Sequence, residues 1–211
     1  MDILKNNIKV PKTARFYASG SMNSDVSELV YVLHGYGMQA PSFIEKFDVL
    51  SSPGRLIVAP EGMSRFYRKG FSGDVVASWM TSDDRETEIE DYVSYLNLLH
   101  EHLLNMHPSK KIMKVTVVGF SQGASTASRW INSRYIKPER FIIWCGEMAP
   151  EVISSFPALP VTLISASDDV FISKEKSDGH ADQMLNGGVE LTRIRFEGGH
   201  DIDKQLLATL F

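Results

Sequence analysis

Short apolar runs alternate along the chain with longer amphipathic stretches. The runs are rich in β-branched residues, which is typical of strands buried on both faces. The clearest of them are residues 28–33, 114–118, 140–145, 160–166 and 189–196. The longest amphipathic stretch has helical spacing, with apolar residues at Ile89, Val93, Leu96, Leu99 and Leu103. Strands that alternate with helices predict an α/β fold with a mostly parallel central sheet and helices on both faces.

Weaker patterns complete this prediction. Two shorter strands are expected at residues 13–18 and 55–59, and further helices at residues 43–50, 173–186 and 202–210. The long helix is expected to begin near Ser82 or Asp83, where Asp83 and Glu86 could form a capping box. Residues 63–79 have no clear periodicity, so an irregular loop is expected there.

The stretch from Lys114 to Ser128 combines a predicted strand, a glycine-rich turn and the start of a helix. The turn reads Gly119-Phe-Ser121-Gln-Gly123. A serine at the apex of such a turn is a candidate nucleophile, and glycine is needed two positions to either side because side chains there would collide. The motif alone is weak. The alternative is a serine in an ordinary glycine-rich turn, such as a phosphate-binding loop.

The segments that follow the other predicted strands supply candidate partners, because sites in parallel sheets lie beyond the carboxyl ends of the strands. His34-Gly-Tyr36-Gly follows the strand at 28–33, and its glycines could let a backbone amide face a developing oxyanion. Asp168 and Asp169 follow a later strand, and loop position alone does not separate them. Of six histidines, only His200 lies on a glycine-rich loop after an inner strand, whereas His180 is expected on an exposed helix face.

Composition narrows the class of protein. The 211 residues suit one domain spanning 1–211. The net charge of −4 and the absence of a basic run argue against a nucleic-acid partner and against binding to an anionic membrane surface. The start of the chain is too polar for a signal peptide and no apolar stretch could span a bilayer, so a cytoplasmic location and no stable membrane insertion are expected. Cys145, the single cysteine, is expected to be a buried strand thiol.

Taken together, these motifs resemble the α/β-hydrolase superfamily, and within it the lidless phospholipase/carboxylesterase family that includes acyl-protein thioesterases. The resemblance extends from Leu33-His-Gly35 to Gly199-His200 and includes Ala59-Pro-Glu-Gly62 and Ala77-Ser-Trp79. It implies an α/β-hydrolase fold with no large lid domain, with Ser121 as nucleophile, Asp169 as the acid and His200 as the base. It further implies that the amides of Tyr36 and Gln122 form the oxyanion hole.

The resemblance also implies an activity, a serine esterase or thioesterase that needs neither a metal nor an organic cofactor. The expected substrate is a small acyl ester or thioester, with lysophospholipids included. Trp79, Met80 and Phe71 are expected to line the acyl pocket, because long irregular segments in compact domains are usually functional. Two other functions stay open: a catalytically silent ligand- or partner-binding protein, and a small serine peptidase. The sequence does not indicate the oligomeric state.

Overall fold

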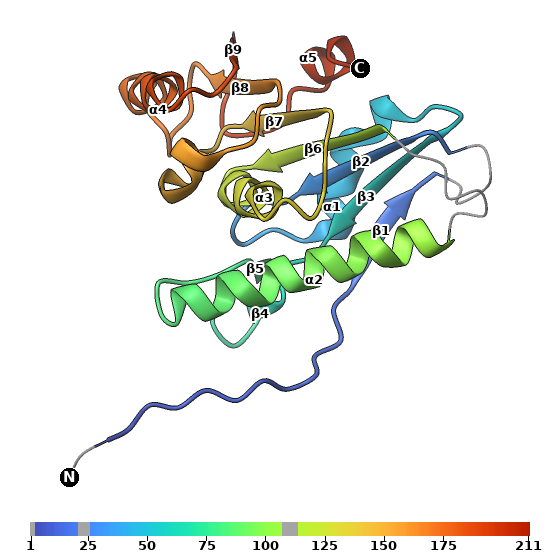
Figure 1. Cartoon of the computed structure of the whole chain (residues 1–211). Coiled ribbons are helices and arrows are strands. Elements are labelled where there is room, and N and C mark those ends of the chain that lie inside the picture. The colour runs from blue at the N-terminus through green and yellow to red at the C-terminus, as the bar shows by residue number, and fades with distance from the viewer. Residues whose placement is uncertain (1–2, 21–25, 107–113) are drawn as a thin grey trace.

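A twisted seven-stranded sheet forms the centre of the protein in the computed structural model, which describes residues 3–20, 26–106 and 114–211 (Figure 1). The strand order is β1-β3-β2-β6-β7-β8-β9. The strands are β1 (Phe16–Ser19), β2 (Glu28–Leu33), β3 (Arg55–Pro60), β6 (Lys114–Phe120), β7 (Arg140–Trp144), β8 (Val161–Ala166) and β9 (Leu191–Phe196). Only the edge pair β1 and β3 is antiparallel within this sheet. The predicted mostly parallel sheet is confirmed.

Helices cover both faces of the sheet, because the inner strands are apolar on both sides. In β2, Leu29, Tyr31 and Leu33 join one hydrophobic cluster, while Val30 and Val32 join the other. The helices α2 (Arg85–Met106), α3 (Gln122–Asn132) and α4 (Lys174–Asn186), with the short η2 (Pro150–Ser155), pack on the first face. The second face is covered by α1 (Ala40–Ile44), η1 (Glu45–Leu50) and α5 (Lys204–Thr209).

Residues 63–79 differ from the sequence-based expectation of an irregular loop. They contain a β-hairpin of two four-residue strands, β4 (Ser64–Tyr67) and β5 (Val75–Ser78), paired antiparallel as a separate sheet. An isolated bridge between Met38 and Ala77 attaches this hairpin to the loop after β2. Strands this short carry too few alternations to be recognised by periodicity.

Smaller corrections concern helix starts and one histidine. The helix α2 begins at Arg85, and it is Glu88 rather than Glu86 that reaches back, accepting a hydrogen bond from the Thr81 amide at 2.5 Å. His180 is buried instead of exposed, because its Nε2 accepts the Met148 amide at 2.8 Å.

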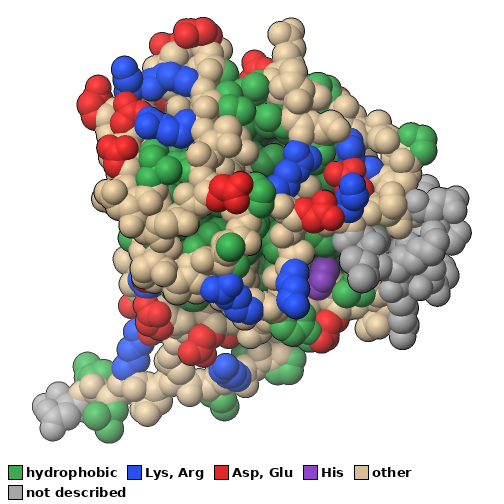
Figure 2. Space-filling view, turned by 45° about the horizontal axis from the view of Figure 1, so that its top comes forward, with side chains coloured by type: hydrophobic (Ala, Val, Ile, Leu, Met, Phe, Trp, Pro, Cys, Tyr) green, Lys and Arg blue, Asp and Glu red, His purple; other side chains and the backbone are tan. Residues whose placement is uncertain are grey.

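The amino-terminal segment, residues 3–15, forms neither helix nor strand, and its first residues extend from the body of the protein in Figure 2. It contacts α2 and the loop before it, where Lys5 pairs with Asp84 at 2.6 Å and Lys9 pairs with Glu90 at 3.6 Å. In the described part of the chain, no helix combines the length and apolar character needed to cross a membrane.

Candidate active site

Ser121 lies at the sharp turn between β6 and α3, with a backbone φ of +52°. A non-glycine residue in this region is strained, and such strain persists only where the surroundings enforce it. The flanking glycines explain how the turn packs. A Cβ at Gly119 would lie 2.5 Å from the Ala124 Cα, and a Cβ at Gly123 would overlap the Leu33 carbonyl oxygen. The turn therefore has the geometry of a nucleophile elbow.

His200 forms a hydrogen bond with Asp169 at the carboxyl edge of the sheet. His200 Nδ1 lies 2.7 Å from Asp169 Oδ2. The other carboxylate oxygen accepts the amides of Phe171 and Ile172 at 2.8 and 3.0 Å. The Asp169 side chain is only 2% exposed. Burial acts to raise the pKa of this carboxyl group, but the hydrogen bonds from His200 and the two amides outweigh it, so the pKa lies below its usual value.

Asp168 points to a different partner from its neighbour. Its carboxylate accepts a hydrogen bond from the Ser167 hydroxyl at 3.0 Å, and its amide donates to the Gly198 carbonyl at 2.8 Å. The Ser167 hydroxyl also accepts the Gly198 amide at 3.1 Å. Asp168 thus helps to join the two loops that follow β8 and β9, while Asp169 contacts the imidazole.

Ser121 and His200 line the same cavity, which has a volume of about 300 Å³. Phe120 and Phe171 flank the imidazole, each with a ring centroid 4.8 Å from that of His200. Tyr36 also lines this cavity. No hydrogen bond joins the Ser121 hydroxyl to His200 among the described residues, as is common before a substrate tightens the geometry.

Two backbone amides are available beside this cavity. Gln122 is the first residue of α3, where amide groups lack partners within the helix and the dipole favours negative charge. The Gln122 side chain is tied down, because Oε1 accepts the Trp79 amide at 3.1 Å and Nε2 donates to the Met80 carbonyl at 2.9 Å. The second amide, that of Tyr36, has no hydrogen-bond acceptor within the described part of the chain.

The buried His34 fixes the loop that carries Tyr36. His34 Nδ1 lies 2.7 Å from the Gly35 carbonyl oxygen, and Nε2 accepts the Gly62 amide at 3.0 Å. A carbonyl can only accept, so Nδ1 carries the proton and the imidazole is neutral. Burial lowers the pKa of His34, which agrees with this state. His34 therefore has a structural position and does not reach the cavity that contains Ser121.

The aromatic residues expected around an acyl pocket have different places in the structure. Trp79 is buried beneath the loop, where it stacks on His34 and donates its indole N–H to the His34 carbonyl at 2.8 Å. Phe71 is fully exposed at the tip of the β4–β5 hairpin and lines neither cavity beside Ser121 and Gln122, which corrects its expected place. Met80 does line a cavity of about 400 Å³, together with Gln122 and Arg129.

Cys145 is a neighbour of the site that sequence reasoning placed only as a buried strand thiol. A sulfur, a carboxylate oxygen and a ring nitrogen from Cys145, Asp169 and His200 lie within 4.8 Å of one another. Burial raises the pKa of the Cys145 thiol to about 12, and the charge of Asp169 adds to this effect. Cys145 is therefore a neutral thiol at ordinary pH, and a metal ion bound at this cluster would have to displace its proton.

Comparison with known structures identifies the fold independently. The structure is similar to that of esterase PE8, with a TM-score of 0.73, 20% identity, and coverage of 94% of this chain and 98% of that one. It is also similar to acyl-protein thioesterase 2 of Zea mays, with a TM-score of 0.68, 17% identity, and coverage of 94% and 96%. A phospholipase/carboxylesterase of Dyadobacter fermentans gives 0.65, 16%, and coverage of 96% and 98%. At these identities the likeness shows the α/β-hydrolase fold, with no large lid.

The sequence itself matches a family model. No curated protein matches the chain at a significant level. The model of the FSH1 serine hydrolases, however, matches residues 24–206, which include the elbow, both aspartates and His200. This match and the similar structures confirm the resemblance expected from the motifs. The chain belongs to the serine hydrolase (FSH1) family.

Proposed function

We propose that this serine hydrolase cleaves carboxylic esters or thioesters through an acyl-enzyme on Ser121, with His200 as the base and Asp169 as the acid. One observation carries the proposal: the 2.7 Å bond from Asp169 to His200 lies beside the cavity that His200 shares with the strained Ser121. A catalytically silent binding protein has no need of this arrangement.

The first half of the reaction forms the acyl-enzyme. His200 Nε2 takes the proton of the Ser121 hydroxyl as the oxygen attacks the acyl carbonyl. Asp169 holds the proton on Nδ1, so that Nε2 is the free acceptor, and it stabilises the imidazolium that forms. The same imidazolium then protonates the leaving alcohol or thiol. The acyl group remains on Ser121.

The oxyanion of the tetrahedral intermediate would lie between the amides of Tyr36 and Gln122. These groups are preorganised by His34 and by the hydrogen bonds of the Gln122 side chain. Losing one donor of this kind typically lowers kcat by about 10²–10³. Water, activated by His200, repeats the cycle on the acyl-enzyme and releases the acid.

The cavities favour small acyl groups within this reaction class. The space beside Ser121 is about 300 Å³, and Met80 contributes to a further 400 Å³ next to Gln122. We infer that short and medium acyl esters react faster than long-chain triglycerides, and that Met80 contacts one arm of the substrate. The cytoplasmic location and the single domain over residues 1–211 remain predictions.

Covalent labelling tests the proposal directly. A fluorophosphonate probe is expected to label the folded protein on Ser121 and to leave Ser121→Ala unlabelled, with both proteins giving the same circular dichroism and melting temperature. The matched control is Ser125→Ala, one turn along α3, which is expected to label as the wild type does. Absence of labelling in the folded wild type, or retained ester turnover in Ser121→Ala, would overturn the assignment.

A further inference from the structure

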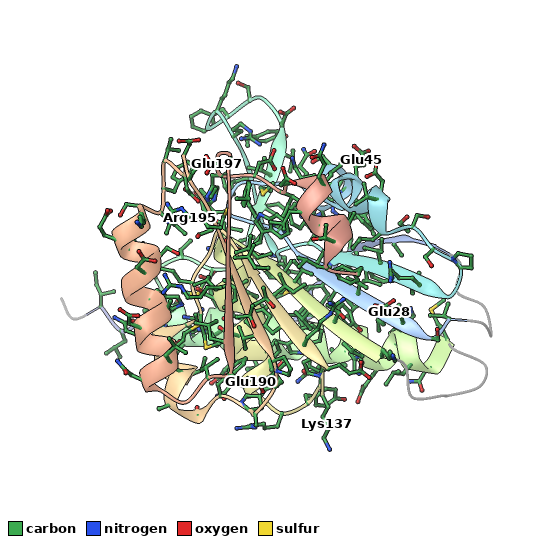
Figure 3. The ribbon with its side chains drawn as sticks, turned by 90° about the horizontal axis from the view of Figure 1, so that it is seen from above. Glu28, Glu45, Lys137, Glu190, Arg195 and Glu197 are labelled. Atoms are coloured by element: carbon green, nitrogen blue, oxygen red, sulfur yellow. The ribbon has the colours of Figure 1, made fainter. Side chains whose placement is uncertain are left out.

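The tip of the β4–β5 hairpin exposes aromatic and basic side chains together. From β4 into the turn that leads to β5, the chain reads Arg65-Phe-Tyr-Arg-Lys-Gly-Phe71. Of the three aromatic residues, only Phe66 is partly covered, whereas Tyr67 and Phe71 are exposed. The hairpin projects beyond the other elements at the top of Figure 3. Tyr67 and Phe71 therefore place exposed aromatic surface beside basic side chains.

The basic residues of the tip are not neutralised by the protein. Arg65, Arg68 and Lys69 take part in none of the ion pairs formed among the described residues. Asp74 is the only acidic residue between Ser64 and Ser78. The hairpin therefore carries a formal charge of +2, three cations less one anion, on a chain whose net charge is −4. The charge of the whole chain argues against an anionic membrane surface, but the local charge of the hairpin has the opposite sign and favours a negatively charged partner there.

The hairpin is also joined to the loop beside Ser121. Tyr36 packs on Phe66 with ring centroids 5.4 Å apart, and Arg68 donates to the Gly37 carbonyl at 3.0 Å. Gln39 donates to the Val75 carbonyl at 2.5 Å. Whatever the tip binds is consequently held next to the cavity that contains Ser121 and Tyr36.

Two classes of anionic partner fit a basic tip, and the aromatic residues separate them. An acidic protein would be recognised by the cations alone. A bilayer with anionic headgroups offers charge for the arginines and lysine and, just beneath, an apolar layer for Phe71, while Tyr67 suits the boundary between the two. Phe71 is fully exposed with cations two and three residues away, which favours the bilayer.

We propose that the β4–β5 hairpin is a docking surface for anionic lipid bilayers, on which the protein binds peripherally and reversibly. Phe71 inserts at the headgroup boundary, and Arg65, Arg68 and Lys69 contact the lipid phosphates. Docking brings the opening of the Ser121 cavity to the bilayer surface. This last step rests on the proposed function and implies that esters exposed at a membrane surface are among the substrates, whereas the docking itself does not depend on catalysis.

Vesicle sedimentation tests the docking with the full chain. Wild type is expected to sediment with vesicles of phosphatidylcholine containing 30% phosphatidylserine, and to stay in solution with pure phosphatidylcholine or at high salt. Lys69→Glu is expected to lower the partition coefficient about thirtyfold, because one attraction of about fivefold is lost and a repulsion of similar size is added. Phe71→Gln removes the inserted side chain and is expected to lower it about tenfold.

Matched controls place the same changes elsewhere. Lys137→Glu reverses a charge on the opposite side of the molecule, where Figure 3 labels Lys137, and Leu98→Gln removes an exposed apolar side chain from α2. Both are expected to bind vesicles as the wild type does. All four variants are expected to hydrolyse a water-soluble short-chain ester normally, whereas Lys69→Glu and Phe71→Gln hydrolyse a medium-chain ester presented in anionic vesicles several-fold more slowly.

Several results would overturn the proposal. They are equal binding of wild type to neutral and anionic vesicles, no binding to either, or hairpin variants that bind no more weakly than their controls. Binding to an acidic protein but not to vesicles would also overturn it. These outcomes are separable from the proposed function, since vesicle binding can be measured on Ser121→Ala. Docking without esterase activity would contradict only the catalytic assignment, and activity without docking would contradict only the hairpin.

Discussion

The elbow at Ser121 and the β4–β5 hairpin are close neighbours, but the elbow is tightly packed whereas the hairpin tip is exposed to solvent. At the elbow, backbone packs on backbone, since a side chain at Gly119 or Gly123 would overlap main-chain atoms of a neighbouring element. At the hairpin tip, a Cβ added to Gly70 would meet nothing within 4 Å, and the side chains around it face solvent. The elbow fixes one geometry, while the hairpin presents side chains to whatever binds.

The two regions differ in how firmly their side chains are held in place. The groups assigned to chemistry are held by buried or main-chain contacts: Asp169 by two amides and His200, and Gln122 by Trp79 and Met80. The hairpin is attached mainly through the loop 34–39. Substitutions at the elbow should therefore alter rate and stability strongly, whereas substitutions at the tip should alter binding and little else.

The largest effect is expected at Asp169. Asp169→Asn would leave the imidazole in the wrong tautomer and lower kcat by up to ~10⁴. Asp168→Asn is the matched control, because among the described residues the Asp168 carboxylate accepts only the Ser167 hydroxyl, and an amide oxygen can do the same. It is expected to change kcat by less than about tenfold. The measurement is kcat on a soluble nitrophenyl ester, and the opposite order would identify Asp168 as the acid.

The next prediction compares the loss of stability caused by alanine at two glycine positions. Gly123→Ala forces a methyl group against the Leu33 carbonyl, which cannot move freely because it belongs to the central strand β2. The free energy of unfolding is therefore expected to fall by more than about 3 kcal/mol. Gly70→Ala has open space, and its positive φ of 76° costs only about 1 kcal/mol. Urea unfolding followed by circular dichroism measures both. Equal losses would contradict the contrast between the two regions.

The smallest effect for any single group is expected from pH, which acts on the body of the protein rather than on the hairpin. Burial lowers the pKa of His34, His100 and His180 below the usual 6.5. Below pH 6.5 the unfolded chain therefore binds more protons than the folded one, and stability falls as the pH drops until the folded histidines also titrate. The slope is at most about 1.4 kcal/mol per pH unit for each histidine.

Urea midpoints at pH 7.5 and at pH 5.5 measure this loss. His34→Gln is the informative variant, since a glutamine cannot titrate. It is expected to be less stable at pH 7.5, yet to lose less stability on acidification than the wild type does. A midpoint that rises on acidification would contradict the assigned direction of the pKa shifts.

The central sheet and the elbow could be predicted from sequence because they depend on local patterns. Runs of β-branched residues predict buried strands, and the two glycines around Ser121 indicate a turn that has no room for side chains. The hydrogen bond of Asp169 rather than Asp168 to His200 also agrees with what the family resemblance implied. The contact of Cys145 with the site was not predictable, because it depends on how β7 lies against the loop after β8.

The segment 63–79 was the least predictable part, for a different reason. Its aromatic residues cannot be distinguished by the sequence pattern, yet their environments are opposite. Trp79 is buried under His34, whereas Phe71 is exposed. Which of them turns inward is decided by the bridge from Ala77 to Met38 and by the anchoring of the Trp79 amide on Gln122, both contacts between distant parts of the chain. No pattern within the segment encodes those contacts.

The buried Cys145 has a practical consequence for experiments on this protein. It is the only cysteine in the sequence, and burial together with a pKa of about 12 should keep it from reacting with thiol reagents while the protein is folded. Its modification rate would then measure how often the core opens. A cysteine introduced at the surface could carry a spectroscopic label without removal of the native one, so the wild-type background is already suited to observing local motion.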